Sequence, residues 1–288
     1  EAEPLVRRAL AIREKVLGPV HVDVGNLYGG LGALARLTGR MEEAEAHYKT
    51  SIAILEKAAG AQSLEVAVSL VSLANHYVQQ GRASEAERLF QRALAIREAR
   101  LGADSPLVAN TLASLAVLYQ NVGRLREAEA LERRVLAIQE TADGRDALVT
   151  ALTLERLAGL LSFDGRNAEA RGLIVRAEGI VARRAAGSVQ HGRVLTMQAL
   201  IDARDNKIDA AVATYRRAIA ILEGHAAIDS DALATALNNL AGLLANAGRG
   251  REAEPLHLRQ LEMRLARDGP DHRTVTNVHG NLGYMYFQ

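Results

Sequence analysis

Residues 70–93 read LVSLANHYVQQGRASEAERLFQRA, and this stretch decides the fold. Its first half carries one apolar stripe at helical spacing, formed by Leu70, Leu73, Ala74 and Tyr77. Its second half carries another, formed by Ala86, Leu89, Phe90 and Ala93. Gly81 lies between the stripes, and glycine suits the left-handed residue that closes a helix. Because the stripes are separated by so few residues, the stretch predicts two antiparallel helices, a helical hairpin.

The hairpin recurs along the whole chain with a step of 42 residues and a single step of 41. One column of the self-alignment holds small residues, at Gly32, Ala74, Ala116, Ala158, Ala199, Ala241 and Gly283. A second column is entirely alanine, at Ala2, Ala44, Ala86, Ala128, Ala170, Ala211 and Ala253. A third column contains Gly39, Gly81, Gly123, Gly165, Asn206 and Gly248. A period this regular predicts stacked units, and the small residues let their helix axes approach closely.

We therefore expect a single all-α domain over residues 1–288, built from antiparallel helix pairs. The full units span residues 22–63, 64–105, 106–147, 148–188, 189–230 and 231–270, and half repeats span 1–21 and 271–288. The chain begins at Glu1 in the middle of a repeat and not at a methionine. We therefore expect it to be part of a longer protein.

The spacing Leu-x2-Leu-Ala-x2-Tyr-x3-Gly-x4-Ala-x3-Phe-x2-Ala over residues 70–93 resembles the tetratricopeptide repeat signature. The longer period, together with AIREKVLG at 11–18, AIREARLG at 95–102 and LNNLA at 237–241, resembles the repeats of kinesin light chain and its bacterial relatives. The resemblance implies a right-handed superhelical solenoid of about six full repeats plus a half repeat at each end. It also implies a peptide-binding adaptor or sensor arm without catalytic activity of its own.

The resemblance further implies that the first helix of each unit lines a concave groove. Residues 13, 10, 9, 6 and 2 positions before the turn glycine share the side of that helix opposite the packed residues. Nine asparagines fall on these positions: Asn26, Asn75, Asn110, Asn121, Asn238, Asn239, Asn246, Asn277 and Asn281. Their amides offer the donors and acceptors that a peptide backbone requires, so we expect an extended peptide as ligand. The competing interpretation is that individual asparagines only solvate the helix or cap neighbouring backbone.

The middle of the predicted groove has a different character. Apolar residues occupy its inner positions, at Leu152, Phe163, Met197 and Leu200. Charged residues lie beside them, at Glu155, Arg156, Arg193 and Arg204. An apolar patch ringed by arginines predicts selection of a bulky side chain flanked by acidic residues. The alternative is that these apolar residues belong to the core.

The composition argues against several other functions. The chain has 35 Lys plus Arg and 34 Asp plus Glu, a net charge of +1, so we expect no nucleic-acid partner. It has no cysteine, and its eight histidines show no HxxxH or HExxH spacing, so we expect no metal and no cofactor. Apolar runs are broken before membrane-spanning length, so we expect no membrane partner and a cytoplasmic location.

The favoured function is a protein or peptide interaction scaffold, not an enzyme. No unit carries a nucleophile, a base and an orienting group at workable spacing. The alternative is a sensor or regulatory arm of a larger enzyme, a protease or NTPase, whose catalytic domain lies outside these residues. A nucleic-acid-binding repeat would need inner Lys and Arg in most units, whereas the inner positions hold mainly Asn, Ser and apolar residues.

Three local expectations complete the interpretation. His76 replaces a leucine of other units and should be a half-buried packing residue. The fifth full unit, with Gln198, Asp202 and Asn206 in place of the usual residues, should pack loosely and form a bend. Open half repeats at the two ends should expose apolar faces and allow head-to-tail self-association, through Val6 and Leu10 at one end and Leu282, Met285 and Tyr286 at the other.

Overall fold

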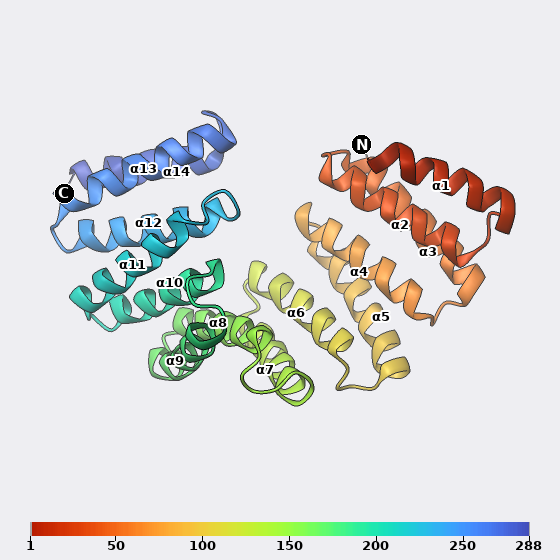
Figure 1. Cartoon of the computed structure of the whole chain (residues 1–288), viewed down its shortest axis with the longest axis horizontal. Coiled ribbons are helices and arrows are strands. Elements are labelled where there is room, and N and C mark those ends of the chain that lie inside the picture. The colour runs from red at the N-terminus through yellow and green to blue at the C-terminus, as the bar shows by residue number, and fades with distance from the viewer. Residues whose placement is uncertain (1, 288) are drawn as a thin grey trace. The chain divides into compact units, whose positions relative to one another are not determined.

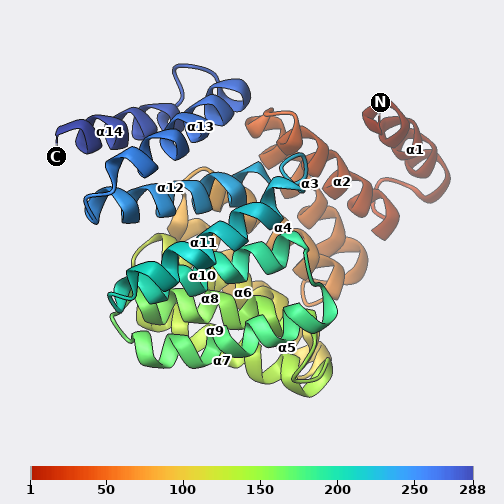
Figure 2. The ribbon, with the colours of Figure 1, turned by 60° about the vertical axis from the view of Figure 1, so that its left-hand side comes forward.

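The structure is a computed structural model and describes residues 2–287. In that range the regular secondary structure consists of fourteen α-helices. The chain divides into two compact units between Ala142 and Asp143, and Figures 1 and 2 show the helices of each. The first unit contains α1 (Ala2–Leu17), α2 (Val22–Leu37), α3 (Met41–Ala59), α4 (Leu64–Gln79), α5 (Ala83–Leu101), α6 (Pro106–Asn121) and α7 (Leu125–Ala142). The second contains α8 (Leu148–Phe163), α9 (Asn167–Arg184), α10 (Val189–Arg204), α11 (Ile208–Glu223), α12 (Ser230–Asn246), α13 (Gly250–Asp268) and α14 (Arg273–Phe287).

The helices pack as six consecutive hairpins, with α2 on α3, α4 on α5, α6 on α7, α8 on α9, α10 on α11 and α12 on α13. Within the described residues α1 and α14 are the two helices outside a hairpin, α1 packing on α2 and α14 on α13. This arrangement confirms the all-α class and the expected number of repeats. Five first helices begin at the residue where the sequence places the start of a repeat, namely Val22, Leu64, Pro106, Leu148 and Val189.

The turns have the backbone geometry that the glycine column predicts. Gly81 has φ +73°, and the other glycines of that column also have positive φ. Asn206, the exception in sequence, adopts φ +59°, a conformation that asparagine tolerates better than most residues. Side chains cap the first helices α2, α4, α6, α10 and α12; in α4, for example, Ser63 accepts a hydrogen bond from the Val66 N–H.

Close approach within a hairpin explains the column of small residues. A Cβ atom at Gly32 would lie 2.8 Å from the Tyr48 ring of the partner helix. Ala74, the equivalent residue of the next hairpin, is completely buried, and so is Phe90 on its partner helix. These contacts fix how near the two axes of each hairpin come.

Successive hairpins of the first unit are joined by a polar cluster that the sequence analysis did not foresee. Glu45 in α3 accepts hydrogen bonds from the Tyr77 hydroxyl at 2.9 Å and from Arg82 Nη1 at 2.6 Å. The Arg82 guanidinium lies over the Tyr77 ring, 3.9 Å from its centroid. Burial opposes ionisation of Glu45, but hydrogen bonds from Lys49, Arg82 and Tyr77 outweigh it and lower its pKa to about 2.

Two of the local expectations meet direct observations in the structure. His76 is completely buried, not half-buried, and neither ring nitrogen has a hydrogen-bond partner. In the fifth unit Asp202 is buried and accepts a 2.6 Å hydrogen bond from Arg171 of α9, so the polar replacement is compensated rather than loosely packed.

At the terminal helices, the apolar residues expected to be exposed are largely buried: Leu10 packs with Val24 and Leu31, and Leu282 and Met285 join the core around Leu240. Exposed apolar side chains do occur there, at Leu5, Ile12, Val16, Tyr284, Tyr286 and Phe287. The end positions Glu1 and Gln288 lie outside the described residues. Of the residues expected at the contact Tyr286 is exposed, and head-to-tail association stays a prediction.

Candidate functional site

Three consecutive first helices of the second unit, α10, α12 and α14, supply most of the side chains of two adjoining cavities. The larger has a volume of about 580 Å³, and Thr235 lines both. We call the larger one the amide cavity; it is lined by Thr235, Asn238, Gln260, Arg264, Thr274, Thr276, Asn277, Val278, Gly280 and Asn281. The smaller, about 320 Å³, is the Met197 cavity; it is lined by Glu155, Arg193, Thr196, Met197, Leu200, Asp229, Asp231, Ala232, Thr235 and Asn239. Both cavities contain residues from the inner positions that the helical register predicts.

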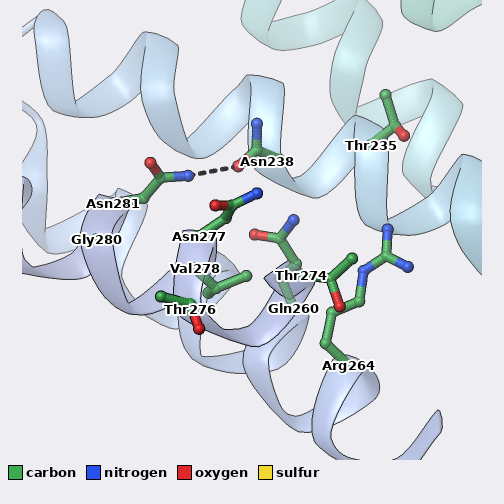
Figure 3. Close-up of a pocket in the computed structure, with 10 residues that line it drawn as sticks. All are labelled: Thr235, Asn238, Gln260, Arg264, Thr274, Thr276, Asn277, Val278, Gly280 and Asn281. Atoms are coloured by element: carbon green, nitrogen blue, oxygen red, sulfur yellow. Dashed lines mark hydrogen bonds between the residues drawn. The ribbon is translucent and has the colours of Figure 1, made fainter. Parts of the chain in front are cut away.

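The amide cavity brings together three of the predicted asparagines. Figure 3 shows Asn238 of α12 beside Asn277 and Asn281 of α14, with Gln260 of α13 next to Asn277. The Asn281 amide donates a 2.8 Å hydrogen bond to Asn238 Oδ1. This pair leaves the Asn238 amino group and Asn281 Oδ1 for other partners, because each carboxamide has two donors and one acceptor oxygen.

Arg264 is the one charged residue of the amide cavity lining, and its charge is neutralised locally. Its guanidinium lies 2.5 Å from an Asp231 carboxylate oxygen and 3.6 Å from one of Asp268. Thr274 donates to the same Asp268 carboxylate at 2.6 Å. The remaining polar side chains of the lining are carboxamides and hydroxyls, so the cavity offers uncharged donors and acceptors to a ligand.

The Met197 cavity is lined by more acidic than basic side chains, whereas a ring of arginines was expected. Three carboxylates line it, from Glu155, Asp229 and Asp231, together with one arginine, Arg193. Arg193 lies 3.7 Å from Glu155 and 4.0 Å from Asp229, so its charge is matched within the wall. Burial raises the pKa of Glu155, and Arg193 and a hydrogen bond from Gln190 counteract that rise.

The expected ring of arginines around an apolar patch is therefore wrong. Arg204 Nη1 donates to Ser162 Oγ at 2.8 Å, and Arg156 Nη2 donates to Thr153 Oγ1 at 3.0 Å. Neither arginine, nor the exposed Phe163, is part of the Met197 cavity lining. Each guanidinium is hydrogen-bonded by a hydroxyl group on its own helix or on the preceding first helix. The repeat pattern in the sequence does not reveal such acceptors.

The other predicted asparagines are spread along the chain. In the first unit Asn26, Asn75, Asn110 and Asn121 are all exposed, on α2, α4 and α6. In the second unit Asn246 lines a third cavity of about 610 Å³, together with Gly248 and Met285. Asn239 is half-buried and lines the Met197 cavity.

Gln260, Arg264, Thr274 and Thr276 of the amide cavity were missed by the sequence analysis. Gln260 belongs to α13, a second helix, whereas the inner positions predicted from the register all lie on first helices. A signal was present: the equivalent residues of the other units are Ser51, Ala93, Val135, Ala177 and Ala218. A long polar residue in this small or apolar column is exceptional.

The hairpin stack and the cavities along its first helices define the chain as a helical-hairpin repeat protein. Family models described as tetratricopeptide repeat match residues 1–57, 65–141 and 233–274. The chain therefore belongs to the tetratricopeptide repeat proteins. No curated protein matches it in sequence.

Three solved structures resemble the chain. A putative kinesin light chain of Podosopora anserina with nearly identical TPR-like repeats is 22% identical, over 71% of this chain and 98% of that one, with a TM-score of 0.62. BtubC (BKLC) from P. vanneervenii is 21% identical, over 85% and 95%, with a TM-score of 0.62. The Rap protein complexed with competence and sporulation factor is 17% identical, over 98% and 84%, with a TM-score of 0.55. At these identities the likeness shows a shared fold.

Within residues 2–287 no group of three or more His, Asp or Glu side chains is arranged to hold a metal ion. In the same range no helix combines the length and the apolar character needed to cross a membrane.

Proposed function

We propose that this chain is a protein-interaction scaffold that binds an extended peptide along the inner faces of its first helices, and that it has no catalytic activity of its own. The observation that carries the proposal is the amide cavity, where Asn238, Asn277 and Asn281 of two consecutive first helices line one open space. A carboxamide donates and accepts at once, which matches the N–H and C=O groups of a peptide backbone.

The charge of the site supports a peptide over a nucleic acid or another polyanion. Arg193 and Arg264 both lie beside carboxylates, so neither is an uncompensated cation. Binding of a phosphate backbone depends on several such cations. A neutral, strongly hydrogen-bonding ligand such as peptide main chain suits this lining better.

The relatives supply a second line of support. The Rap protein, which shares the fold, has been solved in complex with competence and sporulation factor. By analogy, this chain uses its own repeat stack to hold a protein or peptide partner. The analogy rests on fold alone and names no ligand.

A display library of random peptides, selected on the purified chain, tests the proposal without knowledge of the native partner. We expect selected peptides to bind at about micromolar dissociation constants, as a few net hydrogen bonds plus one apolar contact would give. Asn277→Ala should weaken them by about 0.5–1.5 kcal/mol per lost hydrogen bond. Gln91→Ala, at an exposed position on the second helix α5, is the matched control and should leave affinity unchanged. Failure to select any peptide, or equal sensitivity to both changes, would contradict the proposal.

A further inference from the structure

Gln260 places an unsatisfied hydrogen-bond acceptor at the amide cavity. Its side chain is only 6% exposed. Gln260 Nε2 donates to the Ala234 carbonyl oxygen at 3.3 Å, whereas Oε1 has no hydrogen-bond partner. Because a buried acceptor without a partner is unfavourable, such a group calls for an explanation.

Packing alone does not explain a glutamine here. The equivalent residues of the other five hairpins are Ser51, Ala93, Val135, Ala177 and Ala218, so the fold is built without a long polar side chain at this position. The column shows that a small or apolar residue suffices between a second helix and the first helices packed against it. The glutamine is therefore a departure of the last hairpin from its own column.

The nearest side chain that could satisfy Gln260 does not do so. His257, one turn earlier in α13, is itself buried. Burial lowers the His257 pKa, and the Gln260 amide beside the ring partly offsets that effect. Even so, neither His257 Nδ1 nor Gln260 Oε1 has a partner in hydrogen-bond geometry. The acceptor of Gln260 is left for a group that enters the cavity.

The surroundings define what that group can be. A carboxylate or phosphate group could not satisfy Gln260 Oε1, because its oxygens accept hydrogen bonds and do not donate them. An ammonium group would enter a lining whose nearest carboxylates, Asp231 and Asp268, are already held by Arg264. A charged group without a free counter-charge is costly to desolvate. A neutral amide avoids both penalties, because its N–H satisfies Gln260 and its carbonyl accepts from an asparagine of the same cavity, such as Asn277 (Figure 3).

We propose that the amide cavity is a subsite for one neutral amide group of the bound peptide, whose N–H donates to Gln260 Oε1. The amide belongs either to the side chain of an Asn or Gln residue or to the peptide main chain. The inference deepens the proposed function and rests on it. Gln260 is the residue that selects an uncharged donor over an anionic group.

Capped amino acids serve as probes, in a titration of the ¹⁵N-labelled chain followed by NMR. The probes are N-acetyl-glutamine-methylamide, its glutamate analogue and its alanine analogue. We expect the glutamine probe to bind at least about fivefold more tightly than the glutamate probe and to shift the side-chain amide signals of Gln260 and Asn277. Alanine binding as well as glutamine would identify the main-chain amide as the recognised group, and weaker binding of alanine would identify the side-chain amide.

Two variants test the role of Gln260 itself. Gln260→Met keeps the length of the side chain and removes the acceptor, and Gln260→Ala introduces the residue found at Ala93, Ala177 and Ala218. Both should bind the preferred probe about tenfold more weakly, while the melting temperature is unchanged or raised. A structural role for Gln260 would instead lower the melting temperature.

The inference is overturned if no probe binds, if the glutamate probe binds as tightly as the others, or if Gln260→Met leaves binding intact. Its failure is distinguishable from failure of the proposed function. Peptides selected from the library that respond to Asn277→Ala but not to Gln260→Met would reject the subsite and keep the scaffold. A library that yields no binding peptide would reject the scaffold itself.

Discussion

The Asn281 side-chain amide donates a 2.8 Å hydrogen bond to Asn238 Oδ1, joining α14 to α12 across 43 residues of sequence. This contact makes Asn281 part of the packing of α14 against α12 as well as of the cavity lining. We expect Asn281→Ala to lower the free energy of unfolding by up to about 1 kcal/mol, the net value of an exposed neutral hydrogen bond. Urea denaturation measures the loss. Asn277→Ala, in the same cavity, is the control and should leave stability nearly unchanged.

Gly192 of α10 should not tolerate a side chain. A Cβ atom there would lie 2.5 Å from Leu222 Cγ in α11, closer than packed atoms approach. We expect Gly192→Ala to lower stability by about 1–2 kcal/mol, because overpacking outweighs the gain in helix propensity. Gly172→Ala in α9, where no atom lies within 4 Å of the added Cβ, should instead raise stability by about 0.5–1 kcal/mol. Thermal or urea unfolding of the pair checks the difference in sign.

His76 should make the protein sensitive to mild acid. Burial lowers its pKa from the ordinary value of 6.5; nearby Arg36 and Arg82 act in the same direction and Glu45 opposes them. The unfolded chain therefore takes up a proton near pH 6.5 that the folded chain refuses. Stability should be full above that pH and decline as the pH falls below it.

His76→Leu, the residue found at Leu34, Leu118, Leu160 and Leu243, tests this expectation. It removes two buried unpaired nitrogens and should raise stability by about 1–2 kcal/mol at pH 7. The gain should grow as the pH falls below 6.5. Equal stability of the variant and the parent chain at both pH values would show that the imidazole is accommodated without cost.

Glu45 should contribute to a second, more acidic transition. Its pKa is about 2 in the folded chain and 4.5 for the free side chain. As the pH falls, the unfolded state therefore binds a proton before the folded state does. The stability that it contributes is therefore present above about pH 4.5 and is lost as the pH falls toward 2. With solvent screening of a partly exposed site, we expect Glu45→Gln to cost about 1–2 kcal/mol at pH 7 and to flatten this acid limb. The exposed Glu42→Gln should change neither, as followed by circular dichroism at a series of pH values.

The sequence alone determined the number and order of the hairpins and the position of their turns. The apolar period of each helix and the glycine column are local features, and a local feature is set by residues a few positions apart. Five of the residues that the same reasoning named line cavities: Asn238, Asn277 and Asn281 line one, and Arg193 and Met197 line the adjoining one. Helical register is enough to say which residues share a face.

Tertiary structure decided which of those inner side chains are engaged. Asn281 donates a hydrogen bond to Asn238, Arg204 donates one to Ser162, and Arg193 lies beside Glu155, each partner on a different helix and far away in sequence. Such pairings depend on the distance and rotation between neighbouring helices, which a repeat pattern does not specify. For the same reason the acceptor of Gln260 was invisible in sequence: a buried polar atom is unsatisfied only when every helix around it has been placed.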